Sequence, residues 1–400
     1  MRLLSALADT RVRRLWSGQA LSAVGDEVYN IAMVWFAAEM IGLSAGYLSA
    51  VQAASVFTFS LIGGLWADHT DHRRVMIAVD LVRGGAVLIL PVIAWFTPLT
   101  LWMLVPVAIT VSSLSAFFNP ALSAYLPEII DEPELLRASN ALMETTGRLA
   151  RNLGPGVVGA LSAFIPLVHY FTIVALSFFS SAWSVSGVHA KAPAHRSTSS
   201  STGVWSGLLA GHRLTCSQPT VAYVIFTGGI AGAGWLFVFP LGMALHVRAQ
   251  LPADVGALGL LVFAYGIGNL SSNILISGFA FARPARWMFL GRLFSGVGFM
   301  LFSGATTLPQ MMACCALTAV GGPVADLGFI NLLQKYFRDA DLARVLRYGM
   351  ALAYGGLLVL LLLSPQLFSW FSVSKVIFSC AVVIFVCGAA GFVFTREPAS

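Results

Sequence analysis

The strongest constraint on this chain is a series of long apolar runs that recurs from one end to the other with only short polar segments between them. Hydropathy places these runs near residues 15–40, 46–66, 75–96, 99–123, 140–163, 168–188, 219–245, 255–278, 287–304, 309–333, 346–363 and 373–394. Each run approaches the roughly 20 helical residues that cross about 30 Å of hydrocarbon. The sequence therefore predicts an all-α membrane protein with about twelve transmembrane helices.

Composition supports this prediction and argues against other classes of protein. Of the 400 residues, 58% are hydrophobic and only 10% are charged, which is outside the range of water-soluble globular domains. The longest polar interval, from His189 to Ser201, is too short to build the core of a soluble catalytic domain. The sequence contains no His-Glu-x-x-His motif, and its five cysteines lack metal-ligand spacing. We therefore expect a protein that is not an enzyme and that binds no metal and no cofactor.

The basic residues indicate how the helices are oriented. If the N-terminus is cytoplasmic, the Lys and Arg residues of the loops fall in or beside cytoplasmic segments, and only Arg248 and Lys375 fall outside. The net charge of +6 then reflects topology and does not imply binding to nucleic acid. The basic N-terminus is followed by no small-residue cleavage site, so no removable signal peptide is expected. We expect a multi-pass protein of the bacterial inner membrane with both termini in the cytoplasm.

A polar tract divides the chain into two halves. Residues 191–202 are rich in Ser and Thr and poor in large apolar residues, which is typical of a flexible linker. The next stretch, Val204 to Arg213, reads either as a short amphipathic helix on the cytoplasmic membrane surface or as the start of the seventh span. The halves resemble repeats, since Met76–Gly84 can be aligned with Met288–Gly296, and parallel halves are typical of transporters. We predict an N-terminal six-helix half at 1–188, a cytoplasmic linker at 189–218 and a C-terminal six-helix half at 219–400.

A charged turn, Gly63–Arg74, lies between the second and third apolar runs. Asp68 and Arg73 lie at adjacent helix ends, where each can pair with the other or with the end dipole of a neighbouring helix. The turn resembles the cytoplasmic loop between helices 2 and 3 of the major facilitator superfamily at Gly64, Ala67, Asp68 and Arg73. It departs from that pattern at Trp66, His69, Asp71 and His72. The resemblance implies a gating loop that includes Gly64, Asp68 and Arg73, and a loop that only fixes topology is the alternative.

Three further stretches resemble one branch of this superfamily, the prokaryotic exporters that include macrolide efflux pumps and enterobactin-type siderophore exporters. They are Arg14–Asp26, Gly147–Gly159 and Trp205–Gly211. The second resembles the antiporter motif of helix five, in which Gly154, Pro155 and Gly159 let the helix bend and pack tightly. A tight helix contact without bearing on transport direction is the alternative. The arginine that many proton-coupled drug antiporters carry in helix four is missing, because residues 101–118 hold no charge.

Ionisable side chains within the predicted spans are the candidates for binding substrate or protons, because each costs roughly 2.5–3.5 kcal/mol at the midplane without a partner or an aqueous cavity. Asp26 and Glu27 lie near the middle of span one and point about 100° apart. We therefore expect one of them to face substrate or protons and the other to face a neighbouring helix. Asp26 is preferred, because Asn30 lies closer to it in angle and because it closes the stretch that carries the resemblance. A structural role is the alternative.

Helix five supplies charges that span one could meet. Glu144, Arg148 and Arg151 follow one stripe of the helix, so we expect Glu144 to pair with Arg148. Arg151 then lies about 16 Å along the helix from its cytoplasmic end. It is expected to meet Asp26, Glu27 or an anionic group on a substrate.

Span ten carries one more candidate. Asp326 follows Gly321, Gly322 and Pro323, and we expect these residues to break the helix and open it toward the cavity that span ten lines in the resembled fold. Three other charged residues belong to helices outside that cavity and are expected to be structural: Asp80, Arg83 and Arg292.

The resemblance implies a transporter whose two halves rock about a midplane site. The preferred function is export of a small amphiphilic, drug-like compound, driven by inward proton flow. A siderophore exporter is the nearest alternative, and a lysophospholipid translocator or a pore is less favoured. The expected partners are the small-molecule substrate, protons and the lipid bilayer, and the protein is expected to act as a monomer.

Overall fold

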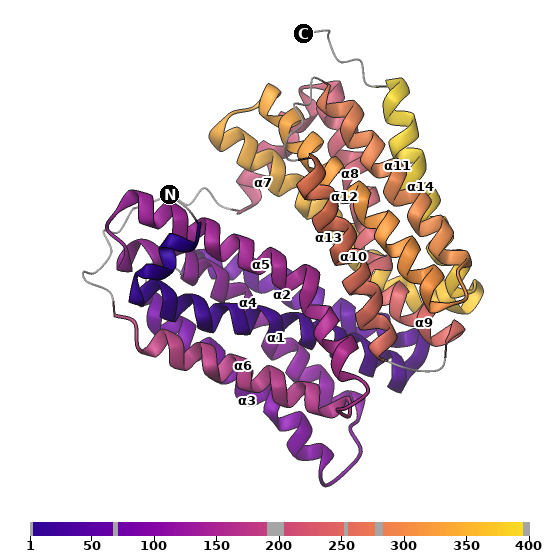
Figure 1. Cartoon of the computed structure of the whole chain (residues 1–400). Helices are drawn as coiled ribbons and strands as arrows, with labels where there is room; N and C mark the ends of the chain where they lie inside the picture. Colours follow the sequence, from indigo (N-terminus) through magenta and orange to yellow (C-terminus); the bar gives the residue numbers. More distant parts are fainter. Residues whose placement is uncertain (1–2, 67–70, 190–203, 252–254, 277–282, 395–400) are drawn as a thin grey trace. The chain divides into compact units, whose positions relative to one another are not determined.

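The computed structural model describes residues 3–66, 71–189, 204–251, 255–276 and 283–394 (Figure 1). These residues form helices joined by short connections. The first half contains α1 (Thr10–Ile41), α2 (Gly46–Trp66), α3 (His72–Ala94), α4 (Leu101–Ile129), α5 (Pro133–Leu161) and α6 (Val168–Ser186). Short 3-10 segments precede α1 (η1, Leu3–Ala8) and join it to α2 (η2, Gly42–Ala45).

The second half begins with α7 (Val204–Cys216), and Ser217 and Gln218 separate it from the first long helix. The long helices are α8 (Pro219–Phe237), α10 (Val255–Ile276), α11 (Pro284–Gly304), α12 (Leu308–Tyr336), α13 (Asp339–Trp370) and α14 (Val373–Phe394). Helix α8 is followed by η4 (Val238–Gly242), in which the backbone is kinked and non-helical at Phe239, and then by α9 (Met243–Gln250).

Ten segments of the described chain are long and apolar enough to span a membrane, and one of them, Thr10–Ser60, covers both α1 and α2. Helix α5 is not among the ten because its charged residues lower its hydropathy. Counting α1 and α2 separately and adding α5 gives twelve helices in the part of the chain that the structure describes. The prediction of an all-α, multi-pass membrane protein with about twelve spans is confirmed.

Several helix ends lie well beyond the predicted boundaries. Helix α4 extends to Ile129 and α5 begins at Pro133, where hydropathy predicted ends near 123 and 140. Pro133 is well placed at the first helical turn, because a proline has no backbone N–H to leave unpaired there. Hydropathy detects only the part of a helix that lies in hydrocarbon, so it misses polar turns that continue past the lipid.

By their internal contacts, the residues divide into two units. The first comprises Met1–Ile41 and Leu48–Ser201, and the second comprises Gly42–Tyr47 and Thr202–Ser400. Helix α7 therefore belongs to the second unit, where His212 Nδ1 lies 2.9 Å from the hydroxyl of Tyr348 on α13. Most of the predicted linker, 190–203, lies outside the described residues.

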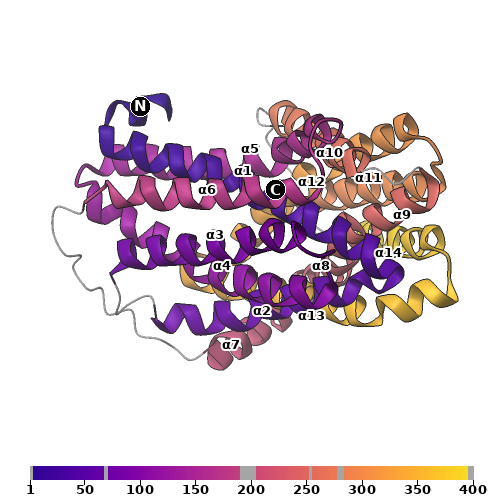
Figure 2. The same ribbon diagram turned by 90° about the horizontal axis from the view of Figure 1, so that it is seen from below.

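In the first unit, α1 packs against both α5 and α6, and α3 packs against α4 and α6 (Figures 1 and 2). Small residues bring α1 and α6 together, because Gly18 and Gly25 lie directly against the serines of α6. Gln19 adds a 2.9 Å hydrogen bond to the hydroxyl of Ser181. Small and polar residues commonly hold membrane helices together, because lipid is as apolar as the side chains and there is no hydrophobic driving force for helix association.

In the second unit, α11 packs between α12 and α14, and α8 packs against α13. Gly291 and Gly321 allow α11 and α12 to approach so closely that a side chain at either position would clash with the facing backbone. Helix α12 is continuous from Leu308 to Tyr336 with Pro323 inside it. The expected break at residues 321–323 is therefore wrong, and Gly321 instead serves close packing against α11.

The segment Gly42-Leu-Ser-Ala-Gly46 has the G-x-S-x-G spacing of a hydrolase nucleophile elbow. It forms the 3-10 turn between α1 and α2, whereas the elbow requires a strand followed by a helix. The spacing therefore does not indicate an active site.

Candidate functional site

A cluster of three ionisable side chains lies within the helices of the first unit. Asp26 on α1 forms an ion pair with Arg83 on α3, whose side chain is only 2% exposed, while that of Asp26 is 40% exposed. Arg83 also lies 3.5 Å from a carboxylate oxygen of Asp80, one turn earlier on α3. The guanidinium carbon lies 3.9 Å from the ring centre of Phe178 on α6, a cation–π contact. We call Asp26, Asp80 and Arg83 the acid–arginine cluster.

The acid–arginine cluster settles the partner of Asp26. The sequence left Asp26 and Glu27 open as partners of Arg151, with Asp26 preferred as the functional acid, and the structure pairs Asp26 with Arg83 instead. Arg83, for which a structural role was expected, is the buried partner of that acid. The cause is geometric, because adjacent residues of a helix point about 100° apart. Asp26 is directed toward α3, which leaves Glu27 on the side of α5.

Glu27 packs directly on helix five. A side-chain carbon at Gly154 would lie 3.1 Å from Cβ of Glu27, which is tighter than an ordinary contact. The side chain of Asn30 lies within hydrogen-bonding reach of Glu27, and Arg151 attracts its carboxylate. Of the two acids of span one that the sequence left open, Glu27 is therefore the one on the side of helix five that Arg151 attracts, and the preferred Asp26 pairs with Arg83.

The remaining charges of helix five form the expected local pair. The Nε atom of Arg148 lies 2.9 Å from a carboxylate oxygen of Glu144, and both side chains are exposed. Arg151 is also exposed. Because α5 begins at Pro133, Arg151 lies about 27 Å along the helix from its start, which is further than the predicted 16 Å.

The glycine and proline residues of helix five serve as packing positions. Gly154 and Pro155 are buried, and α5 continues through Pro155 to Leu161. The hydroxyl of Tyr170 donates a 3.0 Å hydrogen bond to the carbonyl of Val158, next to Gly159. These contacts fit a tight helix junction, and the antiporter role of Gly154, Pro155 and Gly159 stays a prediction.

The charged turn between α2 and α3 is described in part. Asp68 lies outside the described residues, and Gly64 lies in the last turns of α2. Arg73 donates a 2.8 Å hydrogen bond to the carbonyl of Val188, just past the end of α6, and a second one to that of Ser186, the last residue of α6. Arg73 thus holds the end of α6, where carbonyl groups lack helical partners. Its gating role, with Gly64 and Asp68, stays a prediction.

The same region contains contacts that the sequence did not reveal. His72, a departure from the family pattern, lies 2.6 Å from Glu128 at the end of α4. The hydroxyl of Tyr125 donates to the same Val188 carbonyl that Arg73 binds, at 2.9 Å. No spacing rule connects residues on α3, α4 and α6, so these contacts require the tertiary structure.

In the second unit, Asp326 is exposed on α12. Gly322, one turn before it, faces α10, because a carbon added there would lie 3.4 Å from both the Tyr265 hydroxyl and the Asn269 amide nitrogen. Asp326 therefore projects from the α12 face that packs against α10.

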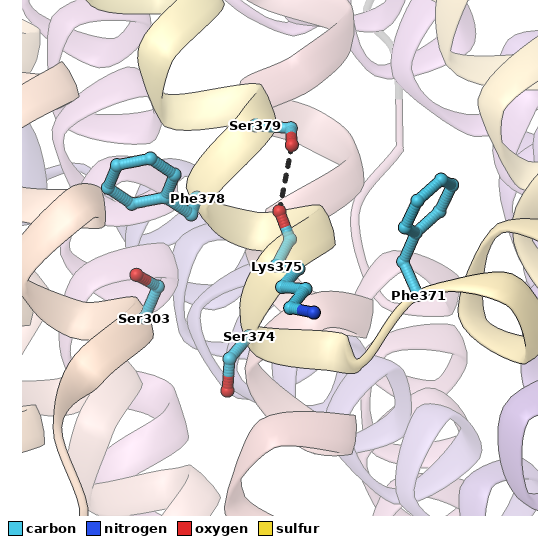
Figure 3. Close-up of a pocket in the computed structure, with 6 residues that line it drawn as sticks. All are labelled: Ser303, Phe371, Ser374, Lys375, Phe378 and Ser379. Atoms are coloured by element: carbon cyan, nitrogen blue, oxygen red, sulfur yellow. Dashed lines mark hydrogen bonds between the residues drawn. The ribbon is translucent and has the colours of Figure 1, made fainter.

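Figure 3 shows a cavity of about 410 Å³ in the second unit, where α13 is followed by α14. It is lined by Ser303, Phe371, Ser374, Lys375, Phe378 and Ser379. None of the predicted site residues lines this cavity. The part of the chain that the structure describes also contains no group of three or more His, Cys, Asp or Glu residues arranged to hold a metal ion.

A model of the transmembrane secretion effector family matches residues 2–390. The multidrug efflux pump Tap of Mycobacterium tuberculosis is 27% identical over 365 residues, covering 86% of this chain and 84% of the pump. Macrolide efflux protein A of Streptococcus pyogenes is 29% identical over 128 residues, covering 31% of this chain and 31% of that protein. The chain thus matches less than a third of the length of the macrolide relative.

Solved transporter structures share the fold. The POT family transporter PepTSo superposes with a TM-score of 0.72 at 10% identity, covering 96% of this chain and 97% of the other. A bacterial homologue of the iron transporter ferroportin, in its inward-facing state, gives a TM-score of 0.68 at 15% identity, covering 96% and 98%. These likenesses confirm the predicted fold class.

Proposed function

We propose that this chain, which belongs to the transmembrane secretion effector family of the major facilitator superfamily, is a secondary active transporter. It exports a drug-like amphiphilic compound in exchange for protons. Relatives named as multidrug and macrolide efflux proteins support the export of drug-like molecules. The observation that carries the proton coupling is the acid–arginine cluster.

The charges of the first unit support a proton site at that cluster. Arg83 offsets only one of the two carboxylates of Asp26 and Asp80, so the fully ionised cluster carries one net negative charge. Glu27 and Arg151, by contrast, offset each other. Because unbalanced charge is costly at membrane depth, a single bound proton would relieve the cluster by making it neutral.

Asp26 is the more accessible acid of the cluster, at 40% exposure, whereas Asp80 is fully buried. In our proposal a proton reaches Asp26 and weakens its pairing with Arg83. The contact between α1 and α3 then differs between the protonated and deprotonated states. A difference of this kind is what allows proton binding to bias one conformation of a carrier over another.

We further propose that the protein lies in the bacterial inner membrane with both termini in the cytoplasm. The excess of basic residues in the predicted cytoplasmic loops supports this orientation. Twelve helices also return the C-terminus to the side on which the N-terminus lies. The expected unit of function is the monomer.

Export of an anionic siderophore is the second candidate. The exposed guanidinium of Arg151 favours it, because arginine pairs well with carboxylates and other planar anionic groups. Arg151→Ala is expected to weaken binding of anionic compounds more than of neutral ones if this alternative holds.

Transport in proteoliposomes with an imposed pH gradient tests the proposal. Asp26→Asn is expected to abolish gradient-driven accumulation of a macrolide or dye while leaving downhill exchange, because the cluster can then no longer change charge at this position. Asp341→Asn is the matched control, since Asp341 forms a 2.8 Å pair with Arg344 outside the cluster. Full accumulation by Asp26→Asn would remove Asp26 from the mechanism and move the proposal to Glu27 or Asp326.

A further inference from the structure

The cavity of Figure 3 lies where α11 and α13 end and α14 begins. Ser303 is the next-to-last residue of α11, and Phe371 follows the last residue of α13. The other lining residues belong to the first two turns of α14: Ser374, Lys375, Phe378 and Ser379. We call this space the α14 cavity. The acid–arginine cluster belongs to the other unit, so the α14 cavity is not part of the proposed proton site.

Lys375 brings a positive charge to the α14 cavity. Its hydrogen bonds to described residues use only its backbone, whose N–H donates to the Ser372 hydroxyl at 3.4 Å and whose carbonyl accepts from the Ser379 hydroxyl at 2.9 Å. The side chain is exposed, and its ammonium group forms no ion pair within the part of the chain that the structure describes. An ammonium group has three N–H donors and no acceptor, so the cavity can bind an anion.

Two serine hydroxyls of the α14 cavity donate their protons to the backbone. Ser303 donates to the carbonyl of Met300 at 2.7 Å. Ser379 donates to the carbonyl of Lys375, the bond that is dashed in Figure 3. A hydroxyl has one proton and two lone pairs, so each of these serines still has lone pairs that can accept a hydrogen bond from a ligand.

The third serine is held by a histidine. The hydroxyl of Ser374 lies 3.4 Å from Nδ1 of His246, which is buried on α9. The Nε2 atom of that ring lies 3.0 Å from the carbonyl of Ala305. A carbonyl can only accept, so Nε2 carries the proton of the neutral ring and Nδ1 accepts from Ser374. The α14 cavity thus combines one cationic donor with three hydroxyl oxygens that act as acceptors.

An exposed apolar stripe leads away from the α14 cavity along α14. Ser379, Val383 and Val386 follow one another at i, i+4 and i+7, so they share one face of the helix. Val383, Val386 and the cavity residue Phe378 are all exposed, as expected of a membrane helix surface that acyl chains cover. The exposed Trp370 at the end of α13 is typical of the boundary between membrane and water. The α14 cavity therefore joins polar groups to a lipid-covered surface.

We propose that the α14 cavity binds the headgroup of an anionic phospholipid that carries hydroxyl groups, of which phosphatidylglycerol is the simplest example. The lipid phosphate pairs with the Lys375 ammonium, and the glycerol hydroxyls donate to the serine oxygens. The acyl chains lie along Phe378 and Val383. Lys375 is one of the two basic residues that the sequence places outside, so in the proposed orientation the lipid belongs to the outer leaflet. This inference goes beyond the proposed export function and does not depend on it.

Three phospholipids with identical acyl chains test the α14 cavity in the purified full-length protein. Phosphatidylcholine is zwitterionic, phosphatidylmethanol has an anionic phosphate diester without hydroxyl groups, and phosphatidylglycerol has both features. Native mass spectrometry of equimolar mixtures measures which lipid the protein retains. We expect phosphatidylmethanol to be retained about threefold over phosphatidylcholine, as an exposed ion pair allows. Phosphatidylglycerol should be retained about threefold over phosphatidylmethanol through its hydrogen bonds.

Two variants separate the two preferences. Lys375→Gln is expected to remove the preference for phosphatidylmethanol over phosphatidylcholine. Ser379→Ala is expected to reduce the preference for phosphatidylglycerol over phosphatidylmethanol and to leave the first preference intact. Lys335→Gln is the matched control, because it removes an exposed lysine in the last turn of α12, at the opposite end of that helix from Ala305. It should keep both preferences. Lys375 and Ser379 are both exposed, so neither substitution disturbs the packed interior.

Three results would overturn the proposal. The first is that Lys375→Gln keeps the wild-type preferences or loses them no more than Lys335→Gln does. The second is that Ser379→Ala prefers phosphatidylglycerol as strongly as the wild type does. The third uses soluble glycerol 3-phosphate, which carries the same phosphate and hydroxyl groups without acyl chains. If an excess of this compound displaces bound phosphatidylglycerol, the α14 cavity binds a free phosphate and not a lipid, whereas retention of the lipid supports the proposal.

Discussion

The two halves each place an arginine in the third of their long helices, and they satisfy it in opposite ways. In the first half, Arg83 on α3 is held by the carboxylates of Asp26 and Asp80. In the second half, Arg292 on α11 is held by the Thr227 hydroxyl and a backbone carbonyl of α8. One arginine is thus part of an ionic cluster, and the other donates hydrogen bonds to neutral groups.

This difference indicates which of the two arginine sites can change its net charge. A cluster of charges can change its net charge by binding one proton, whereas an arginine bound by a hydroxyl and a carbonyl cannot. We infer that, of these two arginine sites, the one in the first half is suited to the coupling proton.

The largest effect is expected from removing each arginine in turn. Arg83→Met leaves Asp26 and Asp80 close together without their cation, and an unpaired buried charge costs about 3–5 kcal/mol. Arg292→Met should cost about 1 kcal/mol, because the Thr227 hydroxyl keeps its 2.6 Å bond to the Tyr223 carbonyl. Thermal unfolding of both variants in detergent, monitored by protein fluorescence, measures the difference between their stabilities.

Equal destabilisation by the two substitutions would contradict the comparison. The double variant Arg83→Met/Asp80→Asn gives a sharper test of the comparison. Removing one carboxylate together with the cation should recover part of the lost stability. Recovery confined to this pair would show that unbalanced charge, and not lost packing on Phe178, causes the effect.

Much of the architecture was predictable because the membrane imposes a simple rule. A helix that crosses lipid needs about 20 apolar residues, so the twelve apolar runs correspond to twelve helices in the part of the chain that the structure describes. The pair of Glu144 and Arg148 was predictable because four residues of a helix always place two side chains on one face. The superfamily was predicted from local motifs because they lie in short continuous stretches, and the family model that matches residues 2–390 confirms it.

The partners of the intramembrane acids were not predictable from the sequence. Asp26 and Glu27 are neighbours in the chain, and a helical wheel shows that they diverge without showing which neighbouring helix each one meets. The ion pair with Arg83 depends on the rotation of both α1 and α3. The ring contacts among Trp235, Phe239 and Tyr265 were hidden for the same reason, since these residues were three of many aromatic residues in apolar runs.

A smaller effect is expected where the first half uses a charged side chain at a helix end. Arg73 binds the carbonyls of Ser186 and Val188 beyond α6, so Arg73→Ala should lower the free energy of unfolding by about 1–3 kcal/mol. The neighbouring Arg74 is 83% exposed and pairs with the half-exposed Asp71, so Arg74→Ala should cost about 0.5 kcal/mol or less. Thermal unfolding of the two single variants compares them, and similar losses would show that Arg73 does not hold α6.

The smallest expected effect on stability concerns the N-terminal caps of α1 and α12. The cap of α1 is a charged carboxylate, and the cap of α12 is a neutral amide. A carboxylate oxygen of Asp9 accepts hydrogen bonds from the backbone N–H groups of Arg11, at 2.8 Å, and Val12, at 3.3 Å. The side-chain oxygen of Gln310 accepts from the N–H groups of Thr306 and Thr307 at the start of α12, at 3.2 and 3.3 Å. Only the cap of α1 can titrate.

The hydrogen bond from the Arg11 side chain, helped by the backbone N–H groups, holds the pKa of Asp9 below its ordinary value of 3.8. A carboxylate whose pKa is lowered by folding stabilises the folded state above its unfolded pKa, and this contribution is lost as pH falls through the folded pKa. At 21% exposure of Asp9, solvent screening limits the contribution to about 0.5–1 kcal/mol.

Amide hydrogen exchange, corrected for its intrinsic pH dependence, should therefore show the first turn of α1 losing protection below about pH 4. The first turn of α12 should keep its protection over the same range, because its cap is neutral. Asp9→Asn should remove the pH dependence at α1 while retaining a cap, and a variant that still loses protection with falling pH would show that another group titrates there.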